Sequence, residues 1–357
     1  MINVTFLMEQ QIGHRTFYNN LRKFMDDDSR IAANWVEISY FDPANFWQSW
    51  PIVPSSIRGS LVGRSQVKQG LANGKGDVAF FNTQVPAALV GRRGIKRPYI
   101  LCTDITPIQY DSMGEHYGHQ PDTISFIAQY KHRVNRELFQ GAYRIIPWSN
   151  WVKDSLINDY AVPEHKITVI PPGVDLSVWQ YFNKEQSDGP MRILFIGGDF
   201  YRKGGEILVK AFENLPDGIA ELVLVTRSEI PAQKNIHVYN DMTPNSPQLI
   251  KLCQTCDIFV LPTNAEAFGI AAVEASAMGL PVIGTAVGGL TDIVKHNQTG
   301  FVINPGDTSS LTNYLLEMAE DTEKRQQFGR EARKRTEQLF NAQINAQLIS
   351  EILQEAA

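Results

Sequence analysis

The 357-residue sequence contains little cysteine, the residue that forms disulfides and structural metal sites in small proteins. It contains three cysteines, Cys102, Cys253 and Cys256, and an odd, low count argues against a disulfide framework. Cys253-x-x-Cys256 has no second pair with which to form a four-cysteine zinc site. We therefore interpret both residues as buried thiols near the end of a helix.

Long apolar runs are also missing. No stretch approaches the roughly 20 apolar residues that a membrane-spanning helix needs. Residues 2–8 are too short for the apolar part of a signal peptide, and no basic residue precedes them. We therefore expect a cytoplasmic protein, either free or held peripherally at the inner face of a membrane.

An excess of positive charge is lacking as well, since the formal net charge is -5. Without a basic tail, nucleic acid is not an expected partner. The charge is uneven: residues 1–185 carry 19 basic and 17 acidic side chains, and residues 186–357 carry 14 and 21. A basic stretch at residues 91–97, with Arg58, Arg64 and Lys68, would suit anionic lipid, although polar residues interrupt these charges and ordinary surface is the better interpretation.

Hydrophobic residues make up 43% of the chain, which is enough for an ample core. Short apolar runs alternate with helical patterns, which predicts parallel, doubly wound sheets. A polar segment at residues 181–190 ends in Asp-Gly-Pro and is the best linker. We predict an N-terminal domain over residues 1–185, completed by a C-terminal helix over residues 341–357, and a second domain over residues 186–340. The strands are expected at residues 1–8, 35–41, 77–82, 98–103, 144–147, 166–170, 192–197, 221–226, 257–261, 281–284 and 299–303.

The most informative stretch is residues 261–290, LPTNAEAFGIAAVEASAMGLPVIGTAVGGL. It follows an apolar strand pattern, continues as a loop and a helix that Gly279 ends, and returns to a second strand. This order predicts a βαβ unit whose loop lies at the carboxyl edge of a parallel sheet, where open α/β sheets bind ligands.

Two carboxylates, Glu266 on the loop and Glu274 about one turn inside the helix, are expected to face the ligand. The amides of Phe268, Gly269 and Ile270 would point out of the helix N-terminus, where an anion binds well. Carboxylates accept hydrogen bonds from sugar and ribose hydroxyls, whereas free amides suit a diphosphate. The combination therefore suits a nucleotide sugar.

The pattern E-A-F-G-x-x-x-x-E, followed by G-x-P-V-I and by Gly288-Gly289, resembles the donor-site motif of retaining glycosyltransferases of family 4. That resemblance implies the α/β GT-B fold, with two Rossmann-like, doubly wound parallel-sheet domains facing across a cleft. It also implies a C-terminal helix that crosses back to the first domain. It is densest over residues 166–300 and weak before Ser149, where the acceptor should bind.

A second stretch, FIGGDFYRKGG at residues 195–205, follows the first strand of the second domain. Gly197 and Gly198 allow close approach of a ligand to the backbone. In the resembling family a Lys-Gly step here binds donor phosphates, with an arginine just after the first glycine. Here Gly198 and Asp199 occupy that region, so we assign the arginine role to Arg202, beside Lys203. The glycine spacing also disfavours a dinucleotide-binding oxidoreductase.

Acceptor-side candidates are fewer. Asp104 ends a strand where the family often carries a polar residue near the donor sugar, although a turn aspartate is the alternative. Gly13 and His14 lie in the first expected loop, with bulkier neighbours than the glycines usual in the family. His116 and His119 lack a third ligand and are read as surface residues, so no metal site is predicted.

The resulting prediction is a metal-independent, retaining glycosyltransferase without a cofactor, which moves a sugar from a nucleotide-sugar donor to a hydroxyl acceptor. The residues expected to carry the chemistry are Glu266, Arg202, Lys203 and Asp104. Alternatives are a sugar-nucleotide epimerase or phosphorylase of the same fold, or a silent partner subunit. The sugar, the base, the acceptor and the oligomeric state stay open.

Overall fold

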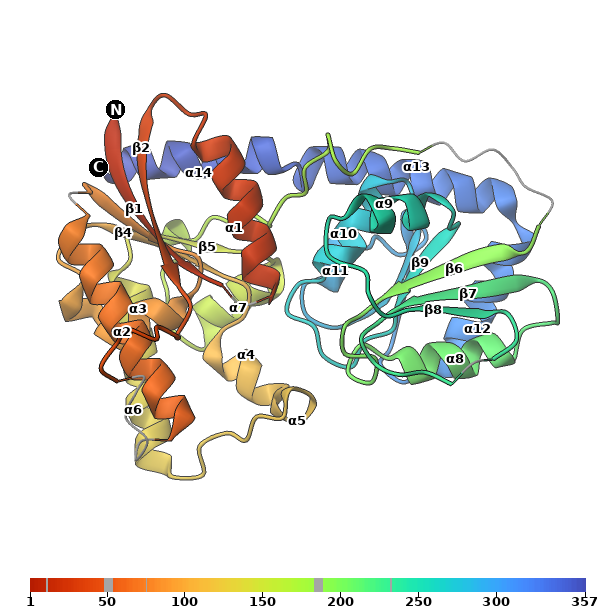
Figure 1. Cartoon of the computed structure of the whole chain (residues 1–357), viewed down its shortest axis with the longest axis horizontal. Helices are drawn as coiled ribbons and strands as arrows, with labels where there is room; N and C mark the ends of the chain where they lie inside the picture. The colour runs from red at the N-terminus through yellow and green to blue at the C-terminus, as the bar shows by residue number, and fades with distance from the viewer. Residues whose placement is uncertain (11, 48–53, 75, 183–188, 232) are drawn as a thin grey trace. The chain divides into compact units, whose positions relative to one another are not determined.

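The computed structural model describes residues 1–10, 12–47, 54–74, 76–182, 189–231 and 233–357. The chain forms two compact units, each with its own sheet (Figure 1). Unit 1 comprises Met1–Gly114, Gln120–Gly173 and Ala342–Ala357, and unit 2 comprises Glu115–His119 and Val174–Asn341. The predicted domain boundary at residue 185 falls outside the described residues.

Unit 1 is built on a five-stranded parallel sheet in the order β2-β1-β3-β4-β5. Its strands are β1 (Ile2–Glu9), β2 (Ile31–Ile38), β3 (Val78–Phe81), β4 (Tyr99–Thr103) and β5 (Arg144–Pro147). The three inner strands are buried almost throughout, which explains their continuous apolar sequence. All five carboxyl ends lie at one edge, and the polar residues that follow them collect there.

Helices surround this sheet. They are α1 (Ile12–Met25), α2 (Ser55–Asn73), α3 (Gln84–Val90), α4 (Pro107–Ser112), α6 (Ser125–Gly141), α7 (Asn150–Asn158) and α14 (Ala342–Ala356). The short helix α5 (Gly114–Tyr117) follows α4, and its residues from Glu115 onward belong to unit 2. The C-terminal helix α14 belongs to this unit and packs along α1, as the sequence predicts. The Ser350 hydroxyl donates to Asp28 Oδ2 at 2.6 Å, and Asn345 Nδ2 donates to the carbonyl of Pro171 at 2.9 Å.

Unit 2 contains a six-stranded parallel sheet in the order β11-β10-β9-β6-β7-β8. The strands are β6 (Met191–Ile196), β7 (Ala220–Val225), β8 (Ile236–Tyr239), β9 (Ile258–Leu261), β10 (Val282–Thr285) and β11 (Gly300–Ile303). The helices are α8 (Gly205–Glu213), α9 (Pro247–Gln254), α10 (Ile270–Ala277), α11 (Leu290–Ile293), α12 (Thr308–Glu320) and α13 (Thr322–Leu339). From β6 the chain adds strands on one side as far as β8 and then returns to β9 on the other side of β6. The carboxyl ends of β6 and β9 therefore form the topological switch point, where open parallel sheets bind ligands.

Three sequence expectations need correction. Residues 166–170 are not a strand: Ile167 bridges to Ile145 and the amide of Ile170 donates to the carbonyl of Pro147, but Pro147 has no N–H with which to return the bond. Gly13 and His14 do not lie in a loop, since α1 already begins at Ile12. The short edge strand β8 and the helices α3, α4, α5 and α11 were not expected from the sequence.

Across the described ranges, no helix combines the length and the hydropathy required to span a membrane.

Candidate functional site

The predicted donor-site residues of unit 2 come together at the carboxyl edge of its sheet. Lys203 lies in the turn between β6 and α8, and its Nζ donates to Glu266 Oε2 in the loop after β9. The two side chains are only 17% and 11% exposed. A buried ion pair therefore connects two loops whose residues lie 63 positions apart in the chain.

Arg202 is placed differently from its predicted role. Its Nε donates to Asp199 Oδ2 at 3.3 Å, and its Nη1 donates to the carbonyl of Ala265 at 3.0 Å. The guanidinium also lies over the Tyr117 ring, 4.8 Å from the ring centre. Tyr117 belongs to residues 115–119, which are part of unit 2. Two of its side-chain donors are thus already engaged, and one of them holds the loop that carries Glu266.

The loop after β9 is fixed by backbone contacts. The Thr285 hydroxyl donates to the carbonyl of Thr263 at 2.7 Å, and the amide of Asn264 donates to the carbonyl of Arg202 at 3.0 Å. Gly288 has φ +53°, and a Cβ there would lie 1.8 Å from the carbonyl oxygen of Glu266. Only glycine permits this approach, which explains the Gly288-Gly289 pair of the sequence motif.

Helix α10 begins directly after this loop. Gly269 precedes it with φ 103°, and Ile270 is its first residue. The first amides of a helix have no partner within the helix, so they suit an anion. Phe268 is only 2% exposed, and its ring packs edge-on against Phe340, 6.2 Å between centres. This contact anchors the turn before α10 to the core of unit 2.

Glu274 lies one turn further along α10 and is 8% exposed. Within the described part of the chain, no donor forms a hydrogen bond to its carboxylate and no cation pairs with it. Burial therefore disfavours its charged form and raises its pKa to about 8. Such a carboxylate is costly to keep in a fold unless a ligand supplies the missing donors.

A second polar cluster lies at the carboxyl edge of the unit 1 sheet. His14 Nε2 is 3.5 Å from Asp104 Oδ1, and the two side chains are 12% and 17% exposed. The His14 ring lies against Trp148, 5.2 Å between centres. The structure thus brings two predicted acceptor-side residues together, whereas Gly13 is exposed in the first turn of α1.

Sequence reasoning missed Glu9 and Tyr40 in this cluster. Glu9 ends β1, and its backbone exchanges two hydrogen bonds with the Asn82 side chain, at 2.7 and 3.1 Å. Its Oε2, the Tyr40 hydroxyl and His14 Nδ1 are buried without a hydrogen bond of ordinary geometry. Burial raises the pKa of Glu9, the adjacent His14 and Tyr40 partly offset this rise, and Asp104 adds to it. The last residue of a strand before an expected loop was the available sequence signal for Glu9.

The histidine and cysteine motifs of the sequence do not form a metal site among the described residues. Among the residues that the structure describes, no group of three His, Cys, Asp or Glu side chains could hold a metal ion. Cys253 and Cys256 are buried thiols, as interpreted from the sequence, and Cys102 is buried as well. Burial raises the pKa of the Cys253 thiol, and the nearby Cys256 and Glu274 raise it further, so the thiol is unreactive.

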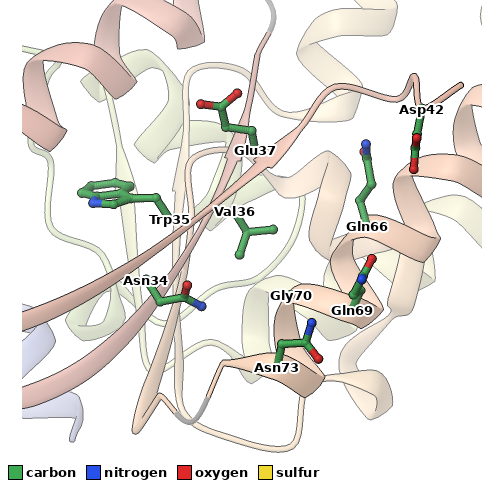
Figure 2. Close-up of a pocket in the computed structure, with 9 residues that line it drawn as sticks. All are labelled: Asn34, Trp35, Val36, Glu37, Asp42, Gln66, Gln69, Gly70 and Asn73. Atoms are coloured by element: carbon green, nitrogen blue, oxygen red, sulfur yellow. The ribbon is translucent and has the colours of Figure 1, made fainter. Parts of the chain in front are cut away.

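A hollow of about 360 Å³ lies elsewhere, along edge strand β2 and helix α2. Figure 2 shows its amide side chains, which include Asn34, Gln66 and Gln69, while the Trp35 ring points away from them. That ring stacks on Phe6, 4.2 Å between centres, on the other side of the strand. None of the predicted site residues lines this hollow.

The architecture is that of the GT-B glycosyltransferases. Sucrose-phosphate synthase from Thermosynechococcus elongatus superimposes with a TM-score of 0.79 at 17% identity, covering 99% of both chains. Anabaena HepE, solved with UDP-glucose, superimposes with a TM-score of 0.71 at 18% identity, covering 99% of this chain and 100% of its own. At these identities the likeness establishes the fold, and it confirms the predicted one.

Sequence models agree along most of the chain. Residues 28–178 match the model of Glycosyltransferase Family 4, and residues 177–335 match that of Glycosyl transferases group 1. The chain belongs to this family of glycosyltransferases, as its motifs indicate.

Curated relatives match over part of their length. D-inositol 3-phosphate glycosyltransferase from Paenarthrobacter aurescens is 28% identical over 245 residues, which is 62% of this chain and 59% of the relative. Glycogen synthase from Mycobacterium tuberculosis is 26% identical over 259 residues, which is 70% of this chain and 62% of the relative. The chain therefore spans less than two thirds of either relative.

Proposed function

We propose that this protein is a retaining glycosyltransferase that moves a sugar from a nucleotide-sugar donor to a hydroxyl of its acceptor. The observation that carries the proposal is Glu274, a buried carboxylate without a donor beside the first turn of α10. Two ribose hydroxyls would supply the donors it lacks, and the adjacent amides would bind the diphosphate. Family membership and the fold support the same function.

The remaining donor-side roles follow from the contacts of unit 2. Glu266 would accept hydrogen bonds from the hydroxyls of the transferred sugar. Lys203, which pairs with Glu266 in the free protein, would then turn its charge toward the diphosphate as that group leaves. The amides of Gly269 and Ile270 add fixed partial positive charge at the same helix end.

The proposed reaction breaks the bond between the anomeric carbon and the diphosphate oxygen. The acceptor hydroxyl forms the new bond on the same face, and its proton passes to the departing phosphate oxygen. Lys203 and the amides of α10 supply the positive charge that this leaving group needs, so we propose that the reaction requires no metal ion. With the phosphate as proton acceptor, Asp104 would tune the rate without being essential.

On the acceptor side, we propose that the unit 1 cluster binds a polyhydroxyl compound. Glu9 and Asp104 offer carboxylate oxygens, and His14 and Tyr40 offer groups that can both donate and accept. Hydroxyls of a sugar or cyclitol would satisfy these buried atoms. A phosphate placed there would meet two acidic side chains, so we expect the acceptor to present uncharged hydroxyls at this cluster.

A silent partner subunit is the competing proposal, because Gly198 stands where the resembling family carries an arginine. Incubation with a panel of nucleotide sugars separates the two. A glycosyltransferase should slowly hydrolyse its donor and transfer the sugar to a suitable polyol, and the product's anomeric coupling in proton NMR should match that of the donor. Added chelator should leave the rate unchanged. Inversion, or complete loss with chelator, would contradict the proposed mechanism.

A further inference from the structure

Arg227 follows β7 directly, at the edge of the sheet where the donor-site loops lie. Strands β6 and β7 are neighbours in register, with Ile196 opposite Val225, so their carboxyl ends meet. A Cβ built on Gly198 would lie 2.8 Å from Arg227 Nη2 and 3.0 Å from its Nε. The guanidinium thus occupies the space into which a side chain at position 198 would point.

The neighbouring glycine carries a second cation. A Cβ on Gly197 would lie 2.9 Å from the Cβ of Lys203. Arg227 and Lys203 therefore lie against consecutive glycines at the end of β6, of which Gly198 is exposed. Two cations beside neighbouring glycines suit a ligand with two linked phosphates.

The cations of this edge differ in how far they are already engaged. Lys203 pairs with Glu266, and Arg202 is bonded to Asp199 and to the carbonyl of Ala265. Arg227, by contrast, is exposed and forms no hydrogen bond or ion pair within the described ranges of the chain. Its donors can therefore bind an anion without first breaking a protein contact.

The backbone that carries Arg227 is nevertheless well fixed. Asn240, which follows β8, donates through Nδ2 to the carbonyls of Thr226 and Ser228, at 3.0 and 2.9 Å. The Ser228 amide donates to the Thr226 hydroxyl oxygen at 3.2 Å. Both neighbours of Arg227 are thus held, so the loop presents its guanidinium from a rigid base and little order is lost on binding.

From these contacts we propose that Arg227 is the arginine that binds the donor diphosphate, while Arg202 positions the Glu266 loop. The inference rests on the proposed function, since it names a ligand of the same donor site. It replaces the assignment of the diphosphate role to Arg202 made from the sequence. A planar guanidinium that is free to bond two phosphate oxygens at once explains why arginine stands at this position.

The test compares ligands with and without phosphates. Calorimetry should show that Arg227→Ala weakens binding of the nucleoside diphosphate tenfold to hundredfold, the range for a hydrogen-bonded charge. Binding of the corresponding nucleoside should be unchanged. Arg227→Lys should recover part of the loss, and Glu274→Ala, the matched control, should weaken both ligands. Because Arg227 is exposed and bonds to no protein group, the variant should melt at the wild-type temperature.

A transplant tests the geometry. In Gly198→Arg/Arg227→Ala the new side chain starts where the old guanidinium lay, so diphosphate affinity should return well above that of Gly198→Ala/Arg227→Ala. Wild-type diphosphate affinity in Arg227→Ala, equal losses for nucleoside and diphosphate, or a transplant no better than its control would each overturn the inference. A wild-type protein that binds no nucleoside diphosphate would instead overturn the proposed function itself.

Discussion

Donor binding should release a proton from Glu274. With a pKa of about 8, this carboxyl is about 0.9 protonated at pH 7 in the free protein. Hydrogen bonds from ribose hydroxyls favour the charged form and should return the pKa toward its ordinary value of 4.5. Binding at pH 7 should then release about 0.9 proton, and ionising the group should cost about 1.4 kcal/mol, or a factor of about ten in Kd.

Calorimetry of a nucleotide sugar in buffers of different ionisation enthalpy measures this proton directly. Both phosphates of such a donor are esterified, so its own charge stays constant between pH 6 and 8. The Kd should fall about tenfold from pH 6 to pH 7 and level off above pH 8. In Glu274→Gln the observed enthalpy should no longer depend on the buffer, and the Kd should no longer depend on pH.

Two results would refute the reasoning. Proton uptake, or an enthalpy independent of buffer in the wild type, would show that Glu274 does not become charged on binding. A pH dependence that survives in Glu274→Gln would assign the proton to another group.

Three further predictions concern stability. Because its pKa is raised in the folded protein, Glu274 lowers the free energy of unfolding increasingly between pH 4.5 and pH 8, and hardly at all below pH 4.5. Glu274→Gln should therefore raise the free energy of unfolding by about 3 kcal/mol at pH 7 but not at pH 4.5. Equal effects at both pH values would contradict this. Lys203→Met should cost about 1–3 kcal/mol in denaturant unfolding by leaving Glu266 buried without its partner, and Glu266→Gln in the same chain should recover most of it. Gly288→Ala should cost about 1–3 kcal/mol more than Gly218→Ala, since both glycines have positive φ but a Cβ on Gly218 meets nothing within 4 Å; similar melting curves would refute the steric argument.

Much of the fold was predictable because buried parallel strands have distinctive sequences. Apolar runs such as residues 258–261 lie between turn residues and find both sheet neighbours, so local pattern and tertiary position agree. Residues 166–170 have a similar apolar pattern, but they form a single bridge, to Ile145 of β5. The sequence pattern cannot show whether a second neighbouring strand is present. Strand β8 was missed because its four residues, IHVY, are too few and too little buried to give the pattern of a buried strand.

The arrangement of the candidate site was predictable where its residues are close in sequence. Glu266, the start of α10 and Glu274 belong to one local strand-loop-helix unit, so their spacing predicts that they lie near one another. Glu9, Tyr40 and Arg227 could not be found in this way, because each lies at or just past the end of a different strand and faces residues far along the chain. Arg227 illustrates this best: nothing in its own segment marks it, and its position matters only because Gly198 leaves space beside it.

The return of α14 to unit 1 affects the order in which the protein can be completed during synthesis. The bond between Ser350 and Asp28 joins residues 322 positions apart, so the first unit begun on the ribosome is the last to gain all its contacts. Residues 174–341, which hold nearly all of unit 2, emerge before that bond can form. Because Met1 and Ala357 both belong to unit 1, unit 2 is in topological terms an insertion within it. Until the last turns of α14 emerge, the nascent chain carries a nearly complete unit 2 and an unfinished unit 1.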